Sequence, residues 1–254
     1  MRFSSLASGS EGNALVVECG KTRILLDCGL GLRDAAARLQ RISLSPEDIT
    51  AILVTHEHED HASGVARFSK KHSIPVWMTF GTFRAQEKSS AGLDIRFIED
   101  YRSFRIDDLE VEPFPVPHDA REPVQFVFGD GAKKLGVITD AGCSTPHIEL
   151  TLSGCDALVL ECNHDPEMLA ASAYPPSLVR RISGRYGHLS NESASGLLSR
   201  LERRKLQHVV AAHLSRKNNT EELARKALAL AMDCDPQWIG VASQEEGFDW
   251  REIS

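Results

Sequence analysis

The amino-acid sequence predicts a mixed α/β sandwich, with sheets on the inside and helices on the outside. Short runs rich in β-branched residues are more frequent in the first half of the chain, and helical patterns in the second half. The 254 residues are 42% hydrophobic and 26% charged, which is typical of a globular chain long enough to bury a large core. Because no long linker or repeat interrupts the chain, a single domain over residues 1–254 is expected.

The predicted elements follow from hydrophobic periodicity and from the turn residues that bound each run. The predicted strands are Ala14–Val17, Arg23–Leu26, Ala51–Thr55, Pro75–Met78, Leu109–Val116, Val124–Phe128, Leu135–Thr139, Ala157–Leu160, Val209–Ala212 and Trp238–Val241. The predicted helices are Leu32–Ile42, Ala62–His72, Pro176–Tyr186, Ser190–Arg204 and Thr220–Met232, the last with Asn219 as its N-cap. Strands and helices do not alternate regularly, which disfavours a doubly wound parallel sheet.

Composition excludes several classes of protein. The longest apolar runs have four residues, whereas about 18 are needed to cross a bilayer. No apolar segment of the signal-peptide kind follows Met1, and the six cysteines include no C-x-x-C pair. No G-x-G-x-x-G or Walker loop is present, which argues against a nucleotide cofactor. These features predict a cytoplasmic protein that does not bind membranes.

The charge of the chain is unevenly distributed. The formal net charge is −7, yet the segment Ser177–Lys217 contains nine basic residues and only two acidic ones. An acidic chain with one basic segment is a poor general nucleic-acid coat, but this segment can hold a phosphate-bearing ligand locally. The alternative is that these arginines form a solvated helix face.

The segment Thr55–His61 has the composition of a metal-binding loop. It contains His56, His58, Asp60 and His61 directly after a buried strand pattern and before a helical one. Imidazoles and a carboxylate at this spacing are ligands for a divalent cation. Because four such ligands would crowd a single ion, two neighbouring ions are expected.

Three further candidate ligands stand where apolar strands end. His118, Asp140 and His213 close the strands that begin near Leu109, Leu135 and Val209. Taken singly, each is as readily interpreted as a hydrogen-bonded core residue or a turn residue. Together with the His-rich loop, they indicate ligands for the same two ions.

This pattern resembles that of the metallo-β-lactamase-fold hydrolases. The segment Leu25–Gly29 is similar to the L-x-D-x-G element of that family. Four further segments resemble the YycJ/WalJ-type branch of the family: Ser5–Ser10, Leu160–Asp165, Gly187–Glu192 and His213–Ser215. The resemblance to tRNase Z and to cyclic-phosphate phosphodiesterases is more distant. The resemblance implies a four-layer αββα sandwich with a binuclear zinc, manganese or iron site, and a phosphodiesterase or nuclease activity.

The resemblance also implies a role for each ligand. One metal is assigned to His56, His58 and His118, the second to Asp60, His61 and His213, and Asp140 bridges the two. Asp27 is expected to orient the metal loop from behind the ligands.

The leaving group of a phosphodiester calls for an additional acid. An alkoxide, with a pKa on the order of 15, departs poorly unless it is protonated, whereas a thiolate with a pKa of about 8.5 needs little help. His188, just before a predicted helix, is the candidate general acid, and the resemblance to tRNase-Z-like enzymes pairs it with Glu161. Asp60 is assigned to the catalytic residues as well as to the second metal.

Several neighbouring residues are candidates for contacts with the substrate. Arg216, Lys217 and Asn218 follow His213 and precede a predicted helix, which suits phosphate binding. Ser8 lies in a segment that either offers backbone N–H groups to a phosphate or forms a plain turn. His164 is interpreted either as a residue supporting the ligands or as a substrate contact.

These observations predict a binuclear phosphodiester hydrolase acting on DNA or RNA ends or on a small cyclic phosphodiester. A thioesterase or lactonase of the glyoxalase-II type is the alternative, because it shares the metal motif but needs no acid at His188. A non-catalytic protein stabilised by metals is a third reading.

Overall fold

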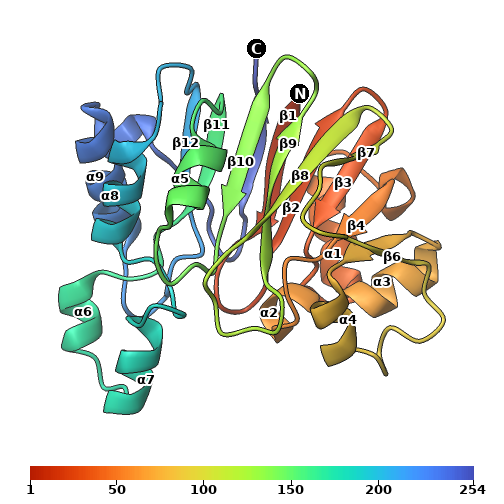
Figure 1. Cartoon of the computed structure of the whole chain (residues 1–254), viewed down its shortest axis with the longest axis horizontal. Helices are drawn as coiled ribbons and strands as arrows, with labels where there is room; N and C mark the ends of the chain where they lie inside the picture. The colour runs from red at the N-terminus through yellow and green to blue at the C-terminus, as the bar shows by residue number, and fades with distance from the viewer.

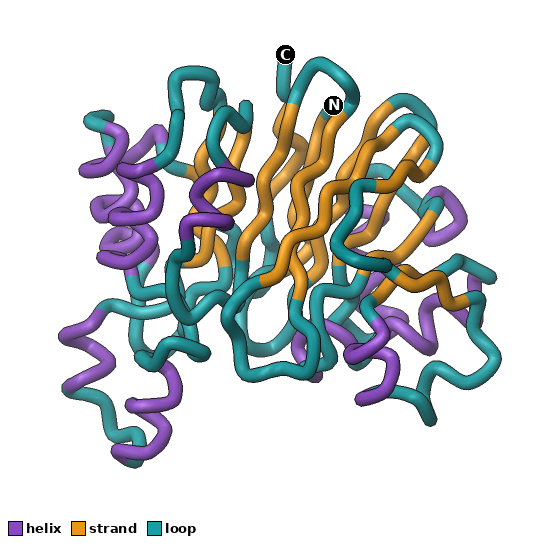
Figure 2. Tube along the Cα trace, in the orientation of Figure 1, coloured by secondary structure: helices purple, strands orange, loops and turns teal.

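Two seven-stranded mixed sheets face each other in the computed structural model, which describes residues 1–254 (Figures 1 and 2). The strand order is β14-β1-β2-β3-β4-β5-β6 in the first sheet and β13-β12-β11-β10-β9-β8-β7 in the second. Helices α1 and α3 lie on the outer side of the first sheet, and α5, α8 and α9 lie on that of the second (Figure 1). The αββα sandwich expected from the sequence is therefore confirmed.

The elements have the following bounds. The strands are β1 Arg2–Ala7, β2 Ala14–Cys19, β3 Thr22–Leu26, β4 Ala51–Leu53, β5 Val76–Met78, β6 Ile95–Phe97, β7 Phe104–Ile106, β8 Leu109–Pro115, β9 Val124–Gly129, β10 Lys134–Ile138, β11 Ala157–Glu161, β12 His208–Ala212, β13 Gly240–Val241 and β14 Phe248–Glu252. The α-helices are α1 Leu32–Arg41, α2 Glu59–Ala62, α3 Val65–His72, α4 Phe80–Ala85, α5 Pro146–Leu152, α6 Pro166–Ala170, α7 Pro176–Ile182, α8 Asn191–Arg200 and α9 Glu221–Met232, and the 3₁₀ helices are η1 Pro46–Asp48 and η2 Pro236–Trp238. None of these helices combines the length and the apolar composition needed to cross a bilayer.

Three apolar clusters fill the spaces between the four layers. The central cluster joins the inner faces of both sheets, with Phe3, Phe126 and Phe128 among its fully buried side chains. One outer cluster packs the first sheet against α1 and α3, and the other packs the second sheet against α5, α8 and α9. Removal of this apolar surface from water is the main force that holds the layers together.

The parallel strands bring their carboxyl ends to one edge of the sandwich. Strands β3, β4 and β5 run parallel in the first sheet, and β10, β11 and β12 run parallel in the second. The loops that follow these strands therefore meet at this edge, which is the usual position of a ligand site in α/β sheets.

Two of the predicted helices differ from the observed ones at their N-terminal ends. The helix expected over Ala62–His72 is divided into α2 and α3, because Gly64 donates its N–H to the Cys28 carbonyl across a close contact. A Cβ on Gly64 would lie 2.0 Å from the Leu30 carbonyl oxygen. The N-cap of α9 is Thr220 rather than Asn219, since the Thr220 hydroxyl accepts from Leu223 N–H.

The remaining differences concern short or edge elements. The helices expected to reach Tyr186 and Arg204 end at Ile182 and Arg200, and the run at Trp238 begins as η2 rather than as a strand. The sequence interpretation missed α4, α5, α6 and strands β1, β6, β7 and β14. Most of these are only three to seven residues long, so tertiary packing rather than local periodicity determines them.

A three-strand ion-pair ladder lies on the first sheet. Glu18 on β2 is opposite Arg2 on β1 and Arg23 on β3, and each arginine Nε lies 2.6 Å from one of its carboxylate oxygens. Burial opposes charge on Glu18, but the two guanidinium groups outweigh this effect and lower the pKa of its carboxyl.

We expect Glu18→Gln to lower the free energy of unfolding by about 1 kcal/mol at neutral pH, because both pairs are partly exposed and screened by solvent. A carboxyl whose pKa is lowered in the folded state stabilises the fold above its unfolded pKa. This contribution is lost as the pH falls through the folded pKa, so the difference between wild type and variant should vanish in acid. Urea titrations over this pH range would check it, with Glu87→Gln as control because the Glu87–Arg84 pair is exposed. If the free energies of unfolding of wild type and Glu18→Gln differed by the same amount at all pH values, the stabilising role of the charged Glu18 carboxylate would be contradicted.

Candidate metal centre

The His-rich loop after β4 is held against the turn after β3. Cys28 N–H donates to the His61 carbonyl at 2.8 Å. Gly29 permits the close packing of the two segments, because a Cβ at this position would lie 1.8 Å from the Asp60 carbonyl oxygen. The glycine of the L-x-D-x-G element therefore has a steric role in positioning the loop.

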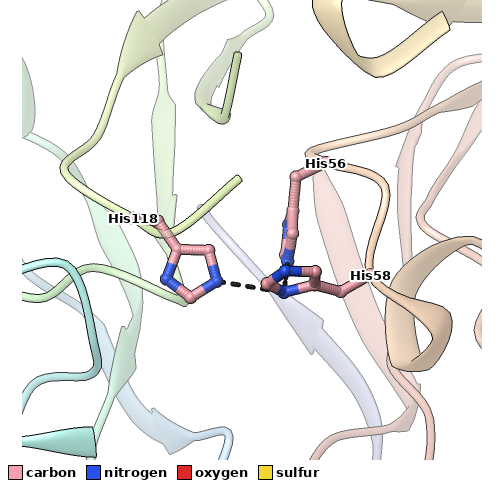
Figure 3. A group of neighbouring side chains, drawn as sticks. All are labelled: His56, His58 and His118. Atoms are coloured by element: carbon pink, nitrogen blue, oxygen red, sulfur yellow. Dashed lines mark hydrogen bonds between the residues drawn. The ribbon is translucent and has the colours of Figure 1, made fainter. Parts of the chain in front are cut away.

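Three histidines form the first cluster of potential ligand atoms. His58 Nδ1 lies 3.1 Å from His56 Nε2 and 3.2 Å from His118 Nε2. His118 comes from the loop after β8 and approaches the other two from the opposite side (Figure 3). The structure thus brings together the three residues that the family resemblance assigned to one metal.

A second cluster lies beside the first. Asp60 Oδ2 is 3.3 Å from His213 Nε2 and 3.5 Å from His61 Nε2. Asp140 lies between the two clusters, with Oδ2 3.0 Å from His61 Nε2 and Oδ1 3.9 Å from His118 Nε2. All seven predicted ligands therefore meet at the common edge of the two sheets, although they come from four distant segments of the chain.

Hydrogen bonds on the outer side of the site orient the imidazoles. His61 Nδ1 lies 2.7 Å from Asp27 Oδ2, His118 Nδ1 lies 3.1 Å from the Gly187 carbonyl and His213 Nδ1 lies 3.2 Å from Glu161 Oε1. Since carboxylate and carbonyl oxygens only accept, each Nδ1 carries the proton. The Nε2 lone pairs of these histidines consequently point into the site.

The arrangement of these atoms fits a divalent metal. Facing lone pairs of imidazole nitrogens and carboxylate oxygens repel one another unless a cation or a proton lies between them. Asp140 is 2% exposed, and its Oδ2 has no hydrogen-bond donor of acceptable geometry. A buried carboxylate oxygen without a donor, 3.0 Å from His61 Nε2, is suited to bind a metal ion.

Three residues of the site have strained backbone conformations. Asp27, Asp140 and His213 follow the ends of β3, β10 and β12, and all three adopt positive φ angles of 60°, 51° and 55°. This conformation is unfavourable for residues other than glycine, and strain of this kind is characteristic of functional sites. At these positions it turns each side chain away from its strand and into the site.

The predicted acid pair is present next to the metal clusters. His188 Nδ1 lies 2.8 Å from Glu161 Oε1, and Glu161 Oε2 accepts the N–H groups of Ala141 at 2.9 Å and Leu189 at 3.1 Å. Burial opposes charge on Glu161, but His188 and His213 outweigh it and lower the pKa of Glu161 to about 2. Burial likewise opposes charge on His188, yet Glu161 and Asp140 raise the pKa of its imidazole.

The structure places the other predicted site residues in varied surroundings. The Ser8 hydroxyl accepts His213 N–H at 2.8 Å, and His164 is buried with Nδ1 3.3 Å from Asn163 Oδ1. The guanidinium of Arg216 pairs with Glu11 and Glu245.

The two remaining candidates in that loop are packed against other parts of the protein. Lys217 Nζ lies 5.6 Å from the centre of the Tyr174 ring, and Asn218 is 1% exposed. Ser8 and Asn218 are therefore surrounded by protein atoms, and Arg216 and Lys217 already have protein partners. Their assignment to substrate binding stays a prediction.

Sequence reasoning missed two residues that support the ligands. Thr55 donates its N–H to Asp27 Oδ1 at 2.8 Å and its hydroxyl to Asp27 Oδ2 at 2.9 Å. Asn163 donates its amide to the His213 carbonyl at 3.1 Å. Thr55 directly precedes the His-rich motif, so its position was the available signal.

A buried amide pair was also missed. Asn191 and Asn219 exchange side-chain hydrogen bonds of 2.8 and 2.9 Å, and Asn219 also donates to the Cys162 carbonyl at 2.7 Å. The pair fixes the start of α8, and hence the segment that carries His188, to the end of β11. No sequence spacing indicates this pairing, because the two residues are 28 positions apart.

Comparisons with known proteins agree with this geometry. The family described as "Beta-lactamase superfamily domain" matches residues 22–213. The exodeoxyribonuclease YycJ of Bacillus anthracis is 37% identical over 238 residues, covering 92% of this chain and 89% of the relative. The exodeoxyribonuclease WalJ of Streptococcus pneumoniae serotype 2 strain D39 is 32% identical over 232 residues, covering 89% and 86%.

The comparison with solved structures concerns the fold. The metallo-β-lactamase-fold protein YhfI of Bacillus subtilis superposes with a TM-score of 0.75 at 13% identity, covering 99% of both chains. At this identity the likeness concerns the fold alone, whereas the two sequence relatives share most of their length with this chain. The chain therefore belongs to the metallo-β-lactamase-fold hydrolases, in the group that includes the YycJ and WalJ proteins.

Proposed function

We propose that this protein is a binuclear metal-dependent phosphodiesterase that acts as a nuclease on the ends of DNA or RNA. The observation that carries the proposal is the Glu161–His188 pair, with 2.8 Å between Oε1 and Nδ1. His188 is no member of the proposed ligand set, but it lies beside it, with Nδ1 3.4 Å from Asp140 Oδ1. The exodeoxyribonuclease names of the YycJ and WalJ relatives support the nucleic-acid substrate.

His188 can donate a proton from its Nε2 atom. Glu161 holds the Nδ1 proton, so Nε2 is the nitrogen left to carry the exchangeable proton of the imidazolium. The side chain is 21% exposed, which leaves a path for a substrate oxygen. Donation from Nε2 to the departing alkoxide removes the main obstacle to cleavage of an unactivated phosphodiester.

The proposed ligand sets are His56, His58 and His118 for one ion and Asp60, His61 and His213 for the other, with Asp140 shared. Zinc, manganese or iron suits these nitrogen and oxygen donors. Two such ions, when bound, lower the pKa of water and neutralise charge on the phosphoryl oxygens. Asp27 and Glu161 hold the imidazoles of His61 and His213 in the orientation that binding requires.

The proposal is tested with metal-loaded protein and end-labelled nucleic acids. Single- and double-stranded DNA and RNA, labelled at the 5′ or the 3′ end, would be incubated with the protein in manganese and in zinc. We expect progressive loss of nucleotides from an end, absent in Asp140→Ala. Elemental analysis of the same preparations should give about two ions per chain for the wild type.

Hydrolysis of a small thioester is measured in parallel to test the glyoxalase-II alternative. Efficient thioester hydrolysis without cleavage of any phosphodiester would contradict the proposal and favour the glyoxalase-II alternative, whose thiolate leaving group needs no acid. Absence of both activities in metal-replete protein would favour the non-catalytic reading.

A further inference from the structure

The loop between β8 and β9 connects the candidate metal centre to two surface features, a basic segment around α7 and an aromatic patch on α4 and β6. Residues 116–123 connect β8 to β9 and include the candidate ligand His118. Different parts of the chain contact this loop at Asp119 and at Glu122. Because these two positions are three residues apart, they can be separated by no more than about 11 Å. The two features therefore flank the same edge of the metal centre.

The first feature is the basic segment that contains α7. Helices α6 and α7 project from the body of the molecule at the end where α2 lies (Figure 1). Arg181 Nε is 2.6 Å from Asp119 Oδ2, and Asp119 N–H donates to the Tyr186 carbonyl. A Cβ on Gly142, two residues after Asp140, would lie 2.3 Å from the Arg185 backbone.

Two arginines of this segment have no ionic partner. Arg180 and Arg185 are exposed and form no ion pair, while Arg181 neutralises Asp119. Arg121, in the middle of the connecting loop, is also exposed and pairs with no acid. These free guanidinium groups provide phosphate-binding positions close to the metal centre.

The second feature is an aromatic patch, formed by the exposed Phe80 and Phe97 and the half-buried Phe83. Phe80 is 57% exposed and Phe97 is 40% exposed, and their ring centres are 5.6 Å apart. Phe83 lies 5.4 Å from Phe97, so the three rings form one group on α4 and β6. Large apolar side chains exposed as a group are uncommon in monomers and mark interaction surfaces.

Hydrogen bonds attach this aromatic patch to the edge of the metal centre. Gly81 N–H donates to Glu122 Oε2, and the Thr79 hydroxyl donates to the Glu122 carbonyl. At the other end of α4, Gln86 Nε2 donates to the carbonyl of Glu57, which is part of the His-rich loop. The patch is thereby held beside the ligands rather than on a remote face.

We propose that unpaired bases at the end of a nucleic-acid strand stack on Phe80 and Phe97 while Arg121, Arg180 and Arg185 bind its phosphates. This inference rests on the proposed phosphodiesterase function and specifies its substrate. Aromatic faces accept any base, and free arginines bind the backbone irrespective of sequence, so binding is independent of sequence. Bases paired within a duplex cannot expose their faces to the rings, which gives preference to single-stranded ends.

Binding is measured by fluorescence anisotropy on the metal-loaded protein. The probes are labelled phosphorothioate oligonucleotides of about 15 nucleotides, which resist cleavage, as a single strand and as a blunt duplex. We expect Phe80→Leu and Phe97→Leu each to weaken single-strand binding about tenfold, whereas Phe80→Trp retains it. Leu230→Ala, at an exposed apolar residue on α9, is the matched control and should have no effect.

The arginines are tested through salt dependence. Arg185→Ala should reduce the slope of log binding constant against log salt concentration by about 0.7, the value for one phosphate contact on a single strand. Arg204→Ala, whose side chain is 92% exposed away from the loop, should leave the slope unchanged. The melting temperature and the metal content should be unchanged in all of these variants, so that a loss of oligonucleotide binding cannot be attributed to unfolding or to loss of metal.

The possible outcomes distinguish failure of the stacking proposal from failure of the proposed phosphodiesterase function. Unchanged oligonucleotide binding in folded Phe80→Leu and Phe97→Leu, or blunt duplex bound as tightly as single strand, would overturn the stacking proposal. A protein that hydrolyses small diesters but binds no oligonucleotide would also overturn it, while leaving the phosphodiesterase chemistry intact. A protein that hydrolyses no phosphodiester at all would refute the proposed function itself.

Discussion

Replacing His188 with alanine should lower the turnover of an unactivated phosphodiester by about 10²- to 10⁴-fold, the usual contribution of a general acid. The same variant should hydrolyse bis-p-nitrophenyl phosphate with a far smaller loss. The reason is the leaving group, because a phenolate departs without a proton whereas a sugar alkoxide does not. The measurement is kcat for both substrates at a fixed concentration of the same metal.

A matched control separates this effect from a general loss of histidine. His147→Ala removes an exposed imidazole on α5 and should change neither rate. Equal losses on both substrates in His188→Ala would contradict the acid role and indicate that His188 instead supports the ligands, since its Nδ1 is 3.4 Å from Asp140 Oδ1. The ratio of the two rates, rather than either rate alone, is therefore the decisive quantity.

Asp140→Asn should abolish hydrolysis of both substrates, in contrast to His188→Ala. Asp140 is buried, and its oxygens lie within 4 Å of the nitrogens of His61, His118, His188 and His213. A neutral amide of the same size cannot offset the charge of two cations at this position. The variant should also lose metal-induced stabilisation, which reaches about 2.7 kcal/mol when the free metal is 100 times its dissociation constant.

Thermal unfolding with and without manganese or zinc measures this stabilisation. Asp156→Asn is the control, because Asp156 is a buried carboxylate that accepts Lys134 N–H far from the metal loops. It should lower the melting temperature without reducing the upward shift produced by metal. Retention of the full metal content and of the metal-induced shift in Asp140→Asn would refute the shared-ligand role.

The residues of the candidate metal centre could be predicted because their chemistry is local. A histidine or aspartate that closes an apolar run can be recognised from the run itself, as at Asp140 and His213. The strain at these two positions was not predictable, since their φ angles of 51° and 55° result from contacts around the whole sheet edge. Likewise, the Thr55 hydroxyl becomes a support for Asp27 only when β3 and β4 are paired.

Substrate contacts depend even more strongly on the assembled fold. The place of Arg216 after His213 predicts phosphate binding, and only the structure shows that this side chain also pairs with Glu11, 205 residues away, and with Glu245. The aromatic patch on α4 and β6 could not be recognised in the sequence, because the exposure of Phe80 depends on whether other segments of the folded chain pack over its ring. Neither property is encoded in a short window of sequence.

The sequence by itself determined the chemistry of the candidate site: the types of the candidate ligands, their positions at strand ends and the sandwich that carries them. Hydrophobic periodicity and residue identity suffice for these features, since both act over a few neighbouring residues. Only the tertiary structure decided which nitrogen of each imidazole faces inward, which charges remain free and which rings stay exposed. These depend on hydrogen bonds and packing between segments far apart in the chain, and such contacts exist only after the two sheets have come together.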